Sequence, residues 1–550
     1  PTAFVSYTGE ALDKKTPLLR SMNALSNQAI RILKLFGKDV DYVSTTVGPE
    51  QEYFLVKKED YEARQDLILT GRTLFGAPSA KGQELEEHYF GVIRPEVSAF
   101  MKELDVELWK LGVPAKTKHN EVAPSQHEMA PIYTDANAAN DQNQLTMEIM
   151  KKVAEKHGLI CLLHEKPFAG VNGSGKHNNW SLATDAGDNL FSPGSTPSQN
   201  ARFLLFLAAF IKGVDEYQEL LRCSVAFAGN DHRLGAQEAP PAIISVFLGE
   251  ELEAIVDSIV NDHDYTDRKR KSLRIGVDVL PAIPKDTTDR NRTSPVAFTG
   301  NKFEFRSLGS SQSIAGPNTI LNTIMAEELE QFAEELEGVK DFSSALHELI
   351  KRVFTEHQRI LFSGNGYDES WIAEAERRGL ANLHNTAEAL PAYILPKNIQ
   401  LMTSHGVYSK SEMMARHEIH MEKYCKVIGI EAGTLVDMVQ HSILGAASAY
   451  ADKLCQSLAH KKAAGVACRT ETALAGTVST LCDELMDRTL ALKTALQSEP
   501  NAPQEELVRY YHDVVFNAMS RVRDIVDQLE QLVDKSYWPF PNYTALLFSV

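Results

Sequence analysis

The sequence has 550 residues, enough for two or more domains or for one large catalytic domain with a helical appendage. With 43% apolar and 24% charged residues it has a globular composition, and its net charge of −18 argues against nucleic acid or an anionic membrane as a partner. The longest apolar run, residues 203–211, is too short to span a bilayer. Six scattered cysteines without a CxxC pair fit reduced thiols, so we expect a cytoplasmic protein.

The first elements along the chain are a helix and a strand that carries two glutamates. Thr16-Pro17 followed by apolar residues at helical spacing predicts a helix that ends at Gly37. Residues 42–56 have the pattern of a strand, and Glu50 and Glu52 share one of its faces. That face could simply be solvated. However, the aromatic pair that follows points to opposite faces, which indicates burial on both sides.

A second acidic pair flanks an expected tight turn. Residues 57–93 have the composition of a charged, irregular insertion, and a helix is expected from about Pro95 to Leu111. If Pro124-Ser125 forms a two-residue loop beyond it, Glu121 and Glu128 lie directly opposite each other on two strands. Like charges at that distance repel unless a divalent cation bridges them, because such cations take several carboxylate oxygens at once.

A glycine-rich stretch then joins two apolar strand candidates. After a helix expected from about Asn137 to His157, the strand candidates are residues 159–163 and 180–183. Between them lie residues 166–181, KPFAGVNGSGKHNNWS, whose glycines allow backbone N–H groups to approach a ligand closely. Taken alone, such a cluster is more often a turn than a binding loop. The isolated glutamates in strand-like contexts favour the binding loop, since buried carboxylates need a cationic partner.

The middle of the chain combines an apolar helix with polar loops. The helix is expected over residues 198–221, and residues 232–241 form a polar loop that ends in two prolines. Residues 264–290 have the mixed charge of an exposed loop, and an arginine-rich turn follows at residues 289–294.

Charged and aromatic residues alternate at residues 302–306, KFEFR. Lys302, Glu304 and Arg306 therefore share one strand face. Two interpretations stay open for this face. It could be a surface ladder of opposite charges, or it could place a metal ligand beside an anion-binding arginine.

From about Pro317 the pattern is helical, and beyond Ser409 it is almost entirely so. The apolar stripes of these helices are typical of core or oligomer contacts, and the WPFP segment at 538–541 reads as a rigid aromatic tail. The pattern divides the chain into an N-terminal helix and linker (1–40), a mixed α and β part (41–405), which the resemblance described next implies is the catalytic domain, and a C-terminal helical region (406–550).

Five blocks in this order resemble the glutamine synthetases, and the type III class in particular. They are GPEQEYF, EVAPSQHE, KPFAGVNGSGKH, RLGAQEAP and a final RNR…KFEFR block, and the YWPFPNYTALLF ending is also type III-like. The resemblance implies an α+β fold, with a curved antiparallel sheet and helices in the catalytic domain. It also implies ATP-dependent ligation of ammonia to the γ-carboxylate of L-glutamate through γ-glutamyl phosphate, giving L-glutamine, ADP and phosphate.

The resemblance further implies roles for individual residues. Two Mg²⁺ or Mn²⁺ ions would be held in sets of three, by Glu52, Glu121 and Glu128 and by Glu50, His177 and Glu304. Arg233 and Arg306 would grip glutamate near Asn172 and Gly173, with Glu238, Arg233 and Arg292 as catalytic residues. ATP would contact Ser181, Asn179, Arg292 and Lys302, where Asn179 stands in place of a second histidine found in many members.

The resemblance also bears on assembly and on alternatives. Family members carry an N-terminal β-rich domain, for which residues 1–40 offer too little, so we expect an N-terminally incomplete version of a large homo-oligomer, with a dodecamer of stacked rings expected. Two alternatives are a γ-glutamyl ligase that uses another amine, and a catalytically silent structural homologue. All six candidate metal positions hold competent ligands, which disfavours the silent homologue.

Overall fold

The computed structural model describes residues 3–265, 272–273, 283–284 and 293–550. Within them, the main sheet has nine strands in the order β2-β3-β1-β6-β11-β10-β7, with β4 and β5 also paired with β1. All these pairs are antiparallel except β10 with β7, which confirms the expected α+β class. The strands are β1 (Val43–Lys57), β2 (Ala115–Asn120), β3 (Gln126–Pro131), β4 (Thr134–Asp135), β5 (Leu159–Leu162), β6 (Gly175–Thr184), β7 (Val246–Phe247), β10 (Val296–Phe298) and β11 (Phe303–Gly309), with β8 (Ser272–Leu273) and β9 (Ile283–Pro284) as a separate pair.

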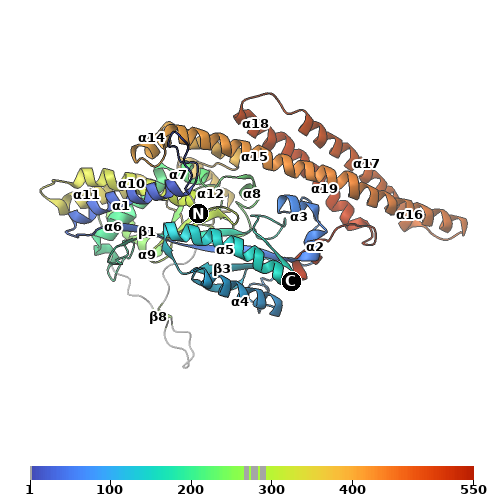
Figure 1. Ribbon diagram of the computed structural model, residues 1–550, viewed down its shortest axis with the longest axis horizontal. Helices are drawn as coiled ribbons and strands as arrows, with labels where there is room; N and C mark the ends of the chain where they lie inside the picture. Colours follow the sequence, from blue (N-terminus) through green and yellow to red (C-terminus); the bar gives the residue numbers. More distant parts are fainter. Residues whose placement is uncertain (1–2, 266–271, 274–282, 285–292) are drawn as a thin grey trace.

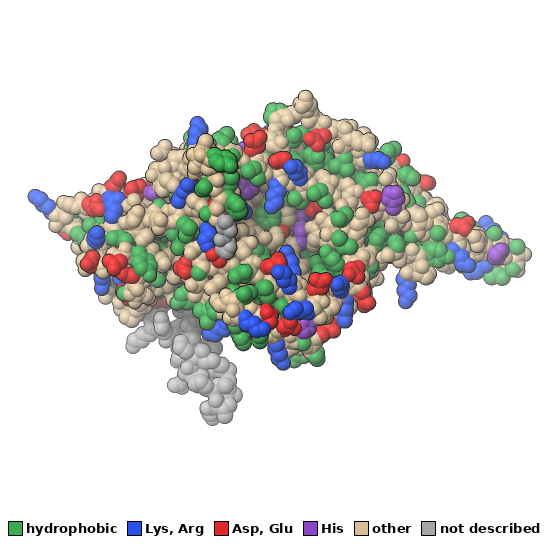
Figure 2. Space-filling model, viewed as in Figure 1, with side chains coloured by type: hydrophobic (Ala, Val, Ile, Leu, Met, Phe, Trp, Pro, Cys, Tyr) green, Lys and Arg blue, Asp and Glu red, His purple; other side chains and the backbone are tan. Residues whose placement is uncertain are grey.

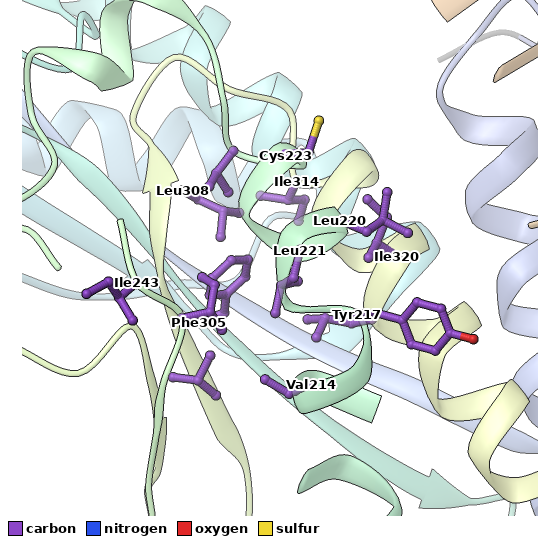
Figure 3. Close-up of a cluster of buried hydrophobic side chains, with 14 of the residues drawn as sticks. Val214, Tyr217, Leu220, Leu221, Cys223, Ile243, Phe305, Leu308, Ile314 and Ile320 are labelled. Atoms are coloured by element: carbon purple, nitrogen blue, oxygen red, sulfur yellow. The ribbon is translucent and has the colours of Figure 1, made fainter. Parts of the chain in front are cut away.

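A group of apolar helices packs behind the β6–β11 half of the sheet. Helix α6 is buried over almost its whole surface, because its central residues are apolar on every side. Figure 3 shows Leu221 of α7 near Phe305 of β11, with Leu220 and Leu308 in the same cluster of buried side chains. The helices are α1 (Lys15–Leu35), α6 (Ala201–Glu216), α7 (Gln218–Cys223), α9 (Glu250–Val260), α10 (Ala315–Leu336) and α11 (Phe342–His357).

Two further helices cover the β1–β3–β5 half of the sheet. They are α4 (Pro95–Lys110) and α5 (Ala136–Lys156), and each begins and ends within two residues of its predicted bounds. Their apolar stripes pack on Tyr53 and Leu55 of β1 in a second core. The other face of β1 is covered near Phe54 and Val56, which pack with Leu546 and Leu547, and Glu52 on that face is only 8% exposed.

The C-terminal half is helical, as expected. Helices α15 (Lys410–Met438), α16 (Leu444–Ala463), α17 (Arg469–Gln497) and α19 (Asn517–Leu532) form a long arm whose far end, made by α16 and α17, projects from the body (Figure 1). Two π-helical turns that the sequence did not predict, Val439–Ile443 and Tyr511–Phe516, interrupt it.

On the face seen in Figure 2, Lys and Arg side chains are interspersed with Asp and Glu. No described helix is long and apolar enough to cross a membrane.

The chain end folds back onto the part of the chain that holds the sheet, residues 41–405, here called the catalytic part (Figure 1). It packs against residues 57–93, which were expected to form a charged, irregular insertion. That segment is irregular only in part, because it contains α2 (Lys58–Glu62) and α3 (Gln65–Thr70) and a buried Arg64–Asp66 ion pair. Phe75 meets the rings of Trp538 and Phe540, and Arg64 donates to the Pro541 carbonyl. The remaining short helices are α8 (Ala228–Asp231), α12 (Glu369–Arg377), α13 (Thr386–Ala389), α14 (Pro396–Ser404), α18 (Gln504–Tyr510) and α20 (Tyr543–Phe548).

Candidate active site

The register of four neighbouring strands gathers the acidic residues on one face of the sheet. On β1, Glu50 lies opposite His177 of β6, and Glu52 lies opposite Glu128 of β3. On the far side of β6, Asn179 lies opposite Glu304 of β11. Because side chains alternate along each strand, these residues project to the same side.

The register predicted for β2 and β3 was wrong. Glu128 lies opposite His119, while the backbone of Glu121 bonds Gln126 at 2.9 Å. The connection is longer than two residues, and Ser125 takes a positive φ of 62° within it. Because the register differs from the expected one by two positions, Glu121 stays on the same face as Glu128, as its diagonal neighbour.

His119 is a site residue that the sequence reasoning missed. Its Nε2 lies 2.9 Å from Glu128 Oε1, and its Nδ1 lies 3.5 Å from Glu121 Oε1. The signal was available, because His119 stands two residues before Glu121 and therefore shares its strand face.

His177 connects the other acidic residues. Its Nδ1 lies 2.9 Å from Glu304 and 3.3 Å from Glu50, and its Nε2 lies 3.9 Å from Glu52. Asn179 donates to the Glu50 carboxylate at 2.9 Å, and the Gly175 N–H donates to Glu52 at 2.6 Å. Each carboxylate is thereby held by a neighbour on another element.

The pKa values in this cluster move in opposite directions. Burial and the nearby charges of Glu52 and Glu128 raise the pKa of Glu121 to about 9. Burial also lifts the pKa of Glu128 above its usual value. Burial acts the same way on Glu304, but the hydrogen bonds and charges of His177 and Arg306 together outweigh it, and the pKa falls below its usual value. Burial and mutual repulsion therefore disfavour the ionised carboxylates at the Glu121 end of the cluster, and a bound cation would favour them.

The donor set fits hard divalent cations. Within this cluster, three groups of described residues have ligand atoms within 4.8 Å of one another: Glu50, His177 and Glu304; Glu52, Glu128 and His177; and His119, Glu121 and Glu128. The first group is one of the two predicted sets. The residues of the second predicted set, Glu52, Glu121 and Glu128, are divided between the other two groups, which share Glu128. Oxygen-rich sites with few imidazoles suit Mg²⁺ or Mn²⁺ better than Zn²⁺.

The same cavity is lined by cationic and amide groups as well as by the acidic cluster, and Arg306 pairs with Glu304 at 3.2 Å. It has a volume of about 170 Å³, and Asn172, Gly173, Arg233, Glu238 and Arg306 line it together with all six candidate metal ligands. Tyr89, His119, Gln126 and Gln237 also line it, and the sequence reasoning had not singled them out. All the residues predicted to hold metal and glutamate therefore meet in one place.

Arg233 is held rigidly on the cavity wall. It is 3% exposed and donates to the carbonyls of Leu308 and Arg306 at 3.2 Å each. A Cβ at Gly175 would overlap its guanidinium, which explains the glycine there. Arg233 Nε has no hydrogen-bond partner among the described residues, so this cation keeps a donor for an anionic ligand.

Glu238 lies on a strained loop beside the cavity. Gln237 and Glu238 have φ angles of 54° and 67°, a region that such residues seldom adopt. The Glu238 carboxylate accepts a hydrogen bond from Asn172 Nδ2 at 2.9 Å, and Asn172 also bonds Gln83 through its backbone and side chain. The loop is therefore tied directly to the glycine-rich stretch.

The residues predicted to contact ATP extend away from this cavity along β6 and the start of β11. Ser181 donates to the carbonyl of Asn301, the neighbour of Lys302. Asn179 bonds Glu50, as described above, and so joins these positions to the acidic cluster. Arg292, predicted to face the transferring phosphate, lies outside the described residues.

Comparisons with known proteins identify the family. A family model described as "Glutamine synthetase, catalytic domain" matches residues 27–227, and "Glutamine synthetase C-terminal domain" matches residues 345–462. A "Glutamine synthetase" of Butyrivibrio fibrisolvens is 47% identical over all of this chain and 79% of its own length. The chain belongs to the glutamine synthetase family.

Two further relatives are similar over the whole chain. The "Type-3 glutamine synthetase" of Dictyostelium discoideum is 47% identical over 76% of its length, and a Bacteroides fragilis "Glutamine synthetase" is 44% identical over 77%. A Staphylococcus aureus "Glutamine synthetase" is 26% identical and covers 46% of this chain. The resemblance to type III glutamine synthetases is thus confirmed, and ATP and divalent metals are the usual requirements of this family.

Proposed function

We propose that this cavity forms L-glutamine from L-glutamate, ammonia and ATP, with ADP and phosphate as the other products. One observation carries the proposal: buried and half-buried carboxylates and histidines share one cavity with Arg233 and Arg306, and Arg306 pairs with Glu304 at 3.2 Å. The acidic side suits cations that accompany a nucleotide, and the arginines suit a carboxylate substrate. Transfer of a phosphoryl group to a carboxylate brings two anions together, so it needs both metal cations and arginines to offset the negative charge.

Glutamate binding is assigned to the arginine side of the cavity. Arg233 and Arg306 would hold its carboxylates, and Asn172 and Gly173 would line the bound chain. Arg233 supports this role because it is buried, fixed by backbone carbonyls and left with an unused Nε–H among the described residues. A guanidinium in that state gains most from an anionic partner.

The opposite side is assigned to the nucleotide phosphates and two divalent ions, Mg²⁺ or Mn²⁺. Glu52, Glu121 and Glu128 would hold one ion, with His119 beside them, and Glu50, His177 and Glu304 the other. When bound, the ions would neutralise the charge of the phosphates and of the reacting carboxylate. Ser181, Asn179 and Lys302 would contact the nucleotide, and Arg292 would stabilise the transferred phosphoryl group.

We assign Glu238 the role of the base that removes a proton from the attacking amine. Ammonium becomes a nucleophile after it loses a proton, and amide formation releases another. The Glu238 carboxylate lies in the cavity wall, 2.9 Å from Asn172 of the proposed glutamate site. Its loop would also help to exclude water from γ-glutamyl phosphate, which would otherwise hydrolyse.

We propose a large homo-oligomer of stacked rings, a dodecamer, in the cytoplasm. Large apolar side chains are exposed on the arm, among them Ile419 and Ile430 of α15 and Met486 and Leu490 of α17. Such side chains are typical of subunit contacts. Mass photometry of the purified protein tests this assembly, and a monomer at micromolar concentration would contradict it.

The function is tested by measuring phosphate release from ATP with each substrate omitted in turn. Release should require glutamate and ammonium together, and glutamine should form in equal amount. A requirement for another amine, such as a polyamine, would instead indicate a different γ-glutamyl ligase. No release under any of these conditions would favour a silent homologue.

A further inference from the structure

A second cavity lies between the C-terminal helices and the loops next to the candidate active site. Its volume is about 260 Å³. Arg72, Lys166 and His232 line it from the catalytic part, and Phe516, Ser520 and Arg523 line it from the arm. None of these residues belongs to the sets assigned above to metal, glutamate or nucleotide.

Three cations line this cavity, and their partners differ. Arg72 forms a bidentate pair with Glu431 at 2.9 and 2.6 Å, and Arg523 pairs with Asp527 at 3.1 Å. Lys166 has no ion pair among the described residues. Its Nζ donates to the Val171 carbonyl and to Gln237 Oε1 instead. The cavity therefore has one positive charge in excess, and burial lowers the pKa of Lys166 to about 8, with Arg233 adding to the effect.

His232 adds a polar atom without a partner among the residues that the structure describes. Its Nε2 is buried without a hydrogen bond in the described part of the chain, and the nearest Glu431 oxygen is 3.9 Å away. The ring is fixed between Phe516, at 5.3 Å, and His164, at 6.4 Å between centroids. A buried nitrogen with no partner is costly unless a ligand or water satisfies it.

The wall contributed by the arm is itself unusual. Phe516 ends the π-helical turn Tyr511–Phe516, where one extra residue is inserted into the helix. Turns of this kind occur frequently at functional sites. Here the turn brings an aromatic ring over His232, the residue that directly precedes Arg233.

Lys166 connects this cavity with the Glu238 loop. The Gln237 side chain that it holds belongs to the strained pair Gln237–Glu238. We propose that the cavity binds a small organic anion with a carboxylate or phosphate group, and that the bound anion draws Lys166 from Gln237 and loosens the Glu238 loop. The second part rests on the proposed function of Glu238, whereas the first part does not.

Binding is tested by calorimetry on the intact protein with Mg²⁺, glutamate and a non-hydrolysable ATP analogue present to fill the active site. Succinate is titrated in one arm and inorganic phosphate in the other, which separates carboxylate from phosphate ligands. One of them should bind saturably, once per chain. Arg523→Gln removes a charge-assisted bond and Ser520→Leu fills the cavity, so each should weaken binding at least about tenfold.

Arg521→Gln is the matched control, because Arg521 lies on the same helix but is exposed and does not line the cavity. It should bind like the wild type. The site is refuted if neither probe binds, or if Ser520→Leu and Arg523→Gln bind as tightly as Arg521→Gln. Because no turnover is measured, this result is independent of the proposed reaction.

The link to the loop is tested by steady-state kinetics with the probe that binds. The KM for ammonium should change at least about twofold in the wild type and in Arg521→Gln, and should stay constant in Ser520→Leu. Binding without any change in KM or kcat in the wild type would overturn the link.

Discussion

At the scale of single residues, the candidate site depends on side chains that hold one another in place across strands. Glu128 belongs to two ligand groups, and His177 contacts Glu50 and Glu304 together. Family motifs in the sequence were sufficient to find these residues. They could not give the length of the connection between β2 and β3, in which Ser125 takes a positive φ, or the register of the two strands. His119 was missed although its spacing from Glu121 placed it on the same strand face; only the actual register shows that it lies opposite Glu128.

Glu238→Gln should separate the two halves of the reaction. The amide cannot take a proton from the amine, so glutamine formation should fall at least about a hundredfold, while phosphorylation of glutamate persists. Single-turnover quench experiments would follow ADP and glutamine separately. Glu250→Gln, at an exposed position on α9, is the control. A parallel fall of both steps, or of neither, would show that Glu238 is not the base.

His119→Ala should weaken Mn²⁺ binding by about 10- to 100-fold, because Glu128 and Glu121 lose the imidazole that orients them. His119→Gln keeps a polar group of similar reach and should retain most of the affinity. Calorimetry with Mn²⁺ measures both variants. Equal affinities in all three proteins would contradict a positioning role for His119.

At the scale of elements, local sequence patterns predicted the bounds of helices correctly where the apolar residues recur at helical spacing. Helices α1, α4 and α5 match their predicted spans closely. Local patterns did not predict structure that depends on contacts between residues far apart in the sequence. The charged composition of residues 57–93 concealed the buried Arg64–Asp66 pair, and the chain end, expected to be a rigid tail, packs on Phe75.

Tyr543 of α20 is central to this docking. Its hydroxyl bonds Thr73 at 2.8 Å and accepts from the Ala169 N–H at 3.0 Å, and its ring is 2% exposed. Tyr543→Ala should cost about 3–5 kcal/mol of unfolding free energy through lost packing. Tyr543→Phe keeps the ring and should cost about 1–3 kcal/mol, because buried donors lose their acceptor.

Urea unfolding followed by circular dichroism measures these two changes. Tyr42→Phe, at a residue that is 54% exposed, should change the free energy by less than about 0.5 kcal/mol. If Tyr543→Ala were as mild as Tyr42→Phe, the chain end would not be docked as the structure describes.

At the scale of the whole molecule, the C-terminal arm and the catalytic part share buried polar contacts. Arg72 pairs with Glu431 of α15, and Arg523 of α19 bonds the carbonyl of Gly76. Helical periodicity predicted that the arm exists, but it could not show which loops the arm covers, because these pairs are hundreds of residues apart in sequence.

His164 should make the protein sensitive to acid. Burial lowers its pKa to about 3, with a smaller contribution from Arg72, and its Nδ1 accepts a bond from the Lys166 N–H. His232 is the other titratable ring that faces it. Since the folded pKa lies below the unfolded value of 6.5, the unfolded chain takes up the proton first as the pH falls. Stability from this residue is therefore complete above pH 6.5 and decreases toward pH 3.

At pH 5 the loss from His164 amounts to about 2 kcal/mol. His164→Gln should make the fall in unfolding free energy between pH 7 and pH 5 shallower by about that amount, as measured by urea midpoints. The control is His263→Gln. Pairing with Asp257 raises the pKa of His263, so its contribution to stability changes with pH in the opposite direction. An unchanged slope in His164→Gln would show that this ring does not resist protonation.

The central claim is that one face of the sheet holds two divalent ions between the strands β3, β1, β6 and β11. Mn²⁺ binding per chain, followed by the loss of the free-ion signal in electron paramagnetic resonance, tests it most directly. Wild-type protein should bind two ions, and Glu128→Gln and Glu304→Gln, which alter different ligand groups, should each lose tight binding of one. Two ions bound with unchanged affinity in both variants, or no tight binding in the wild type, would contradict the claim.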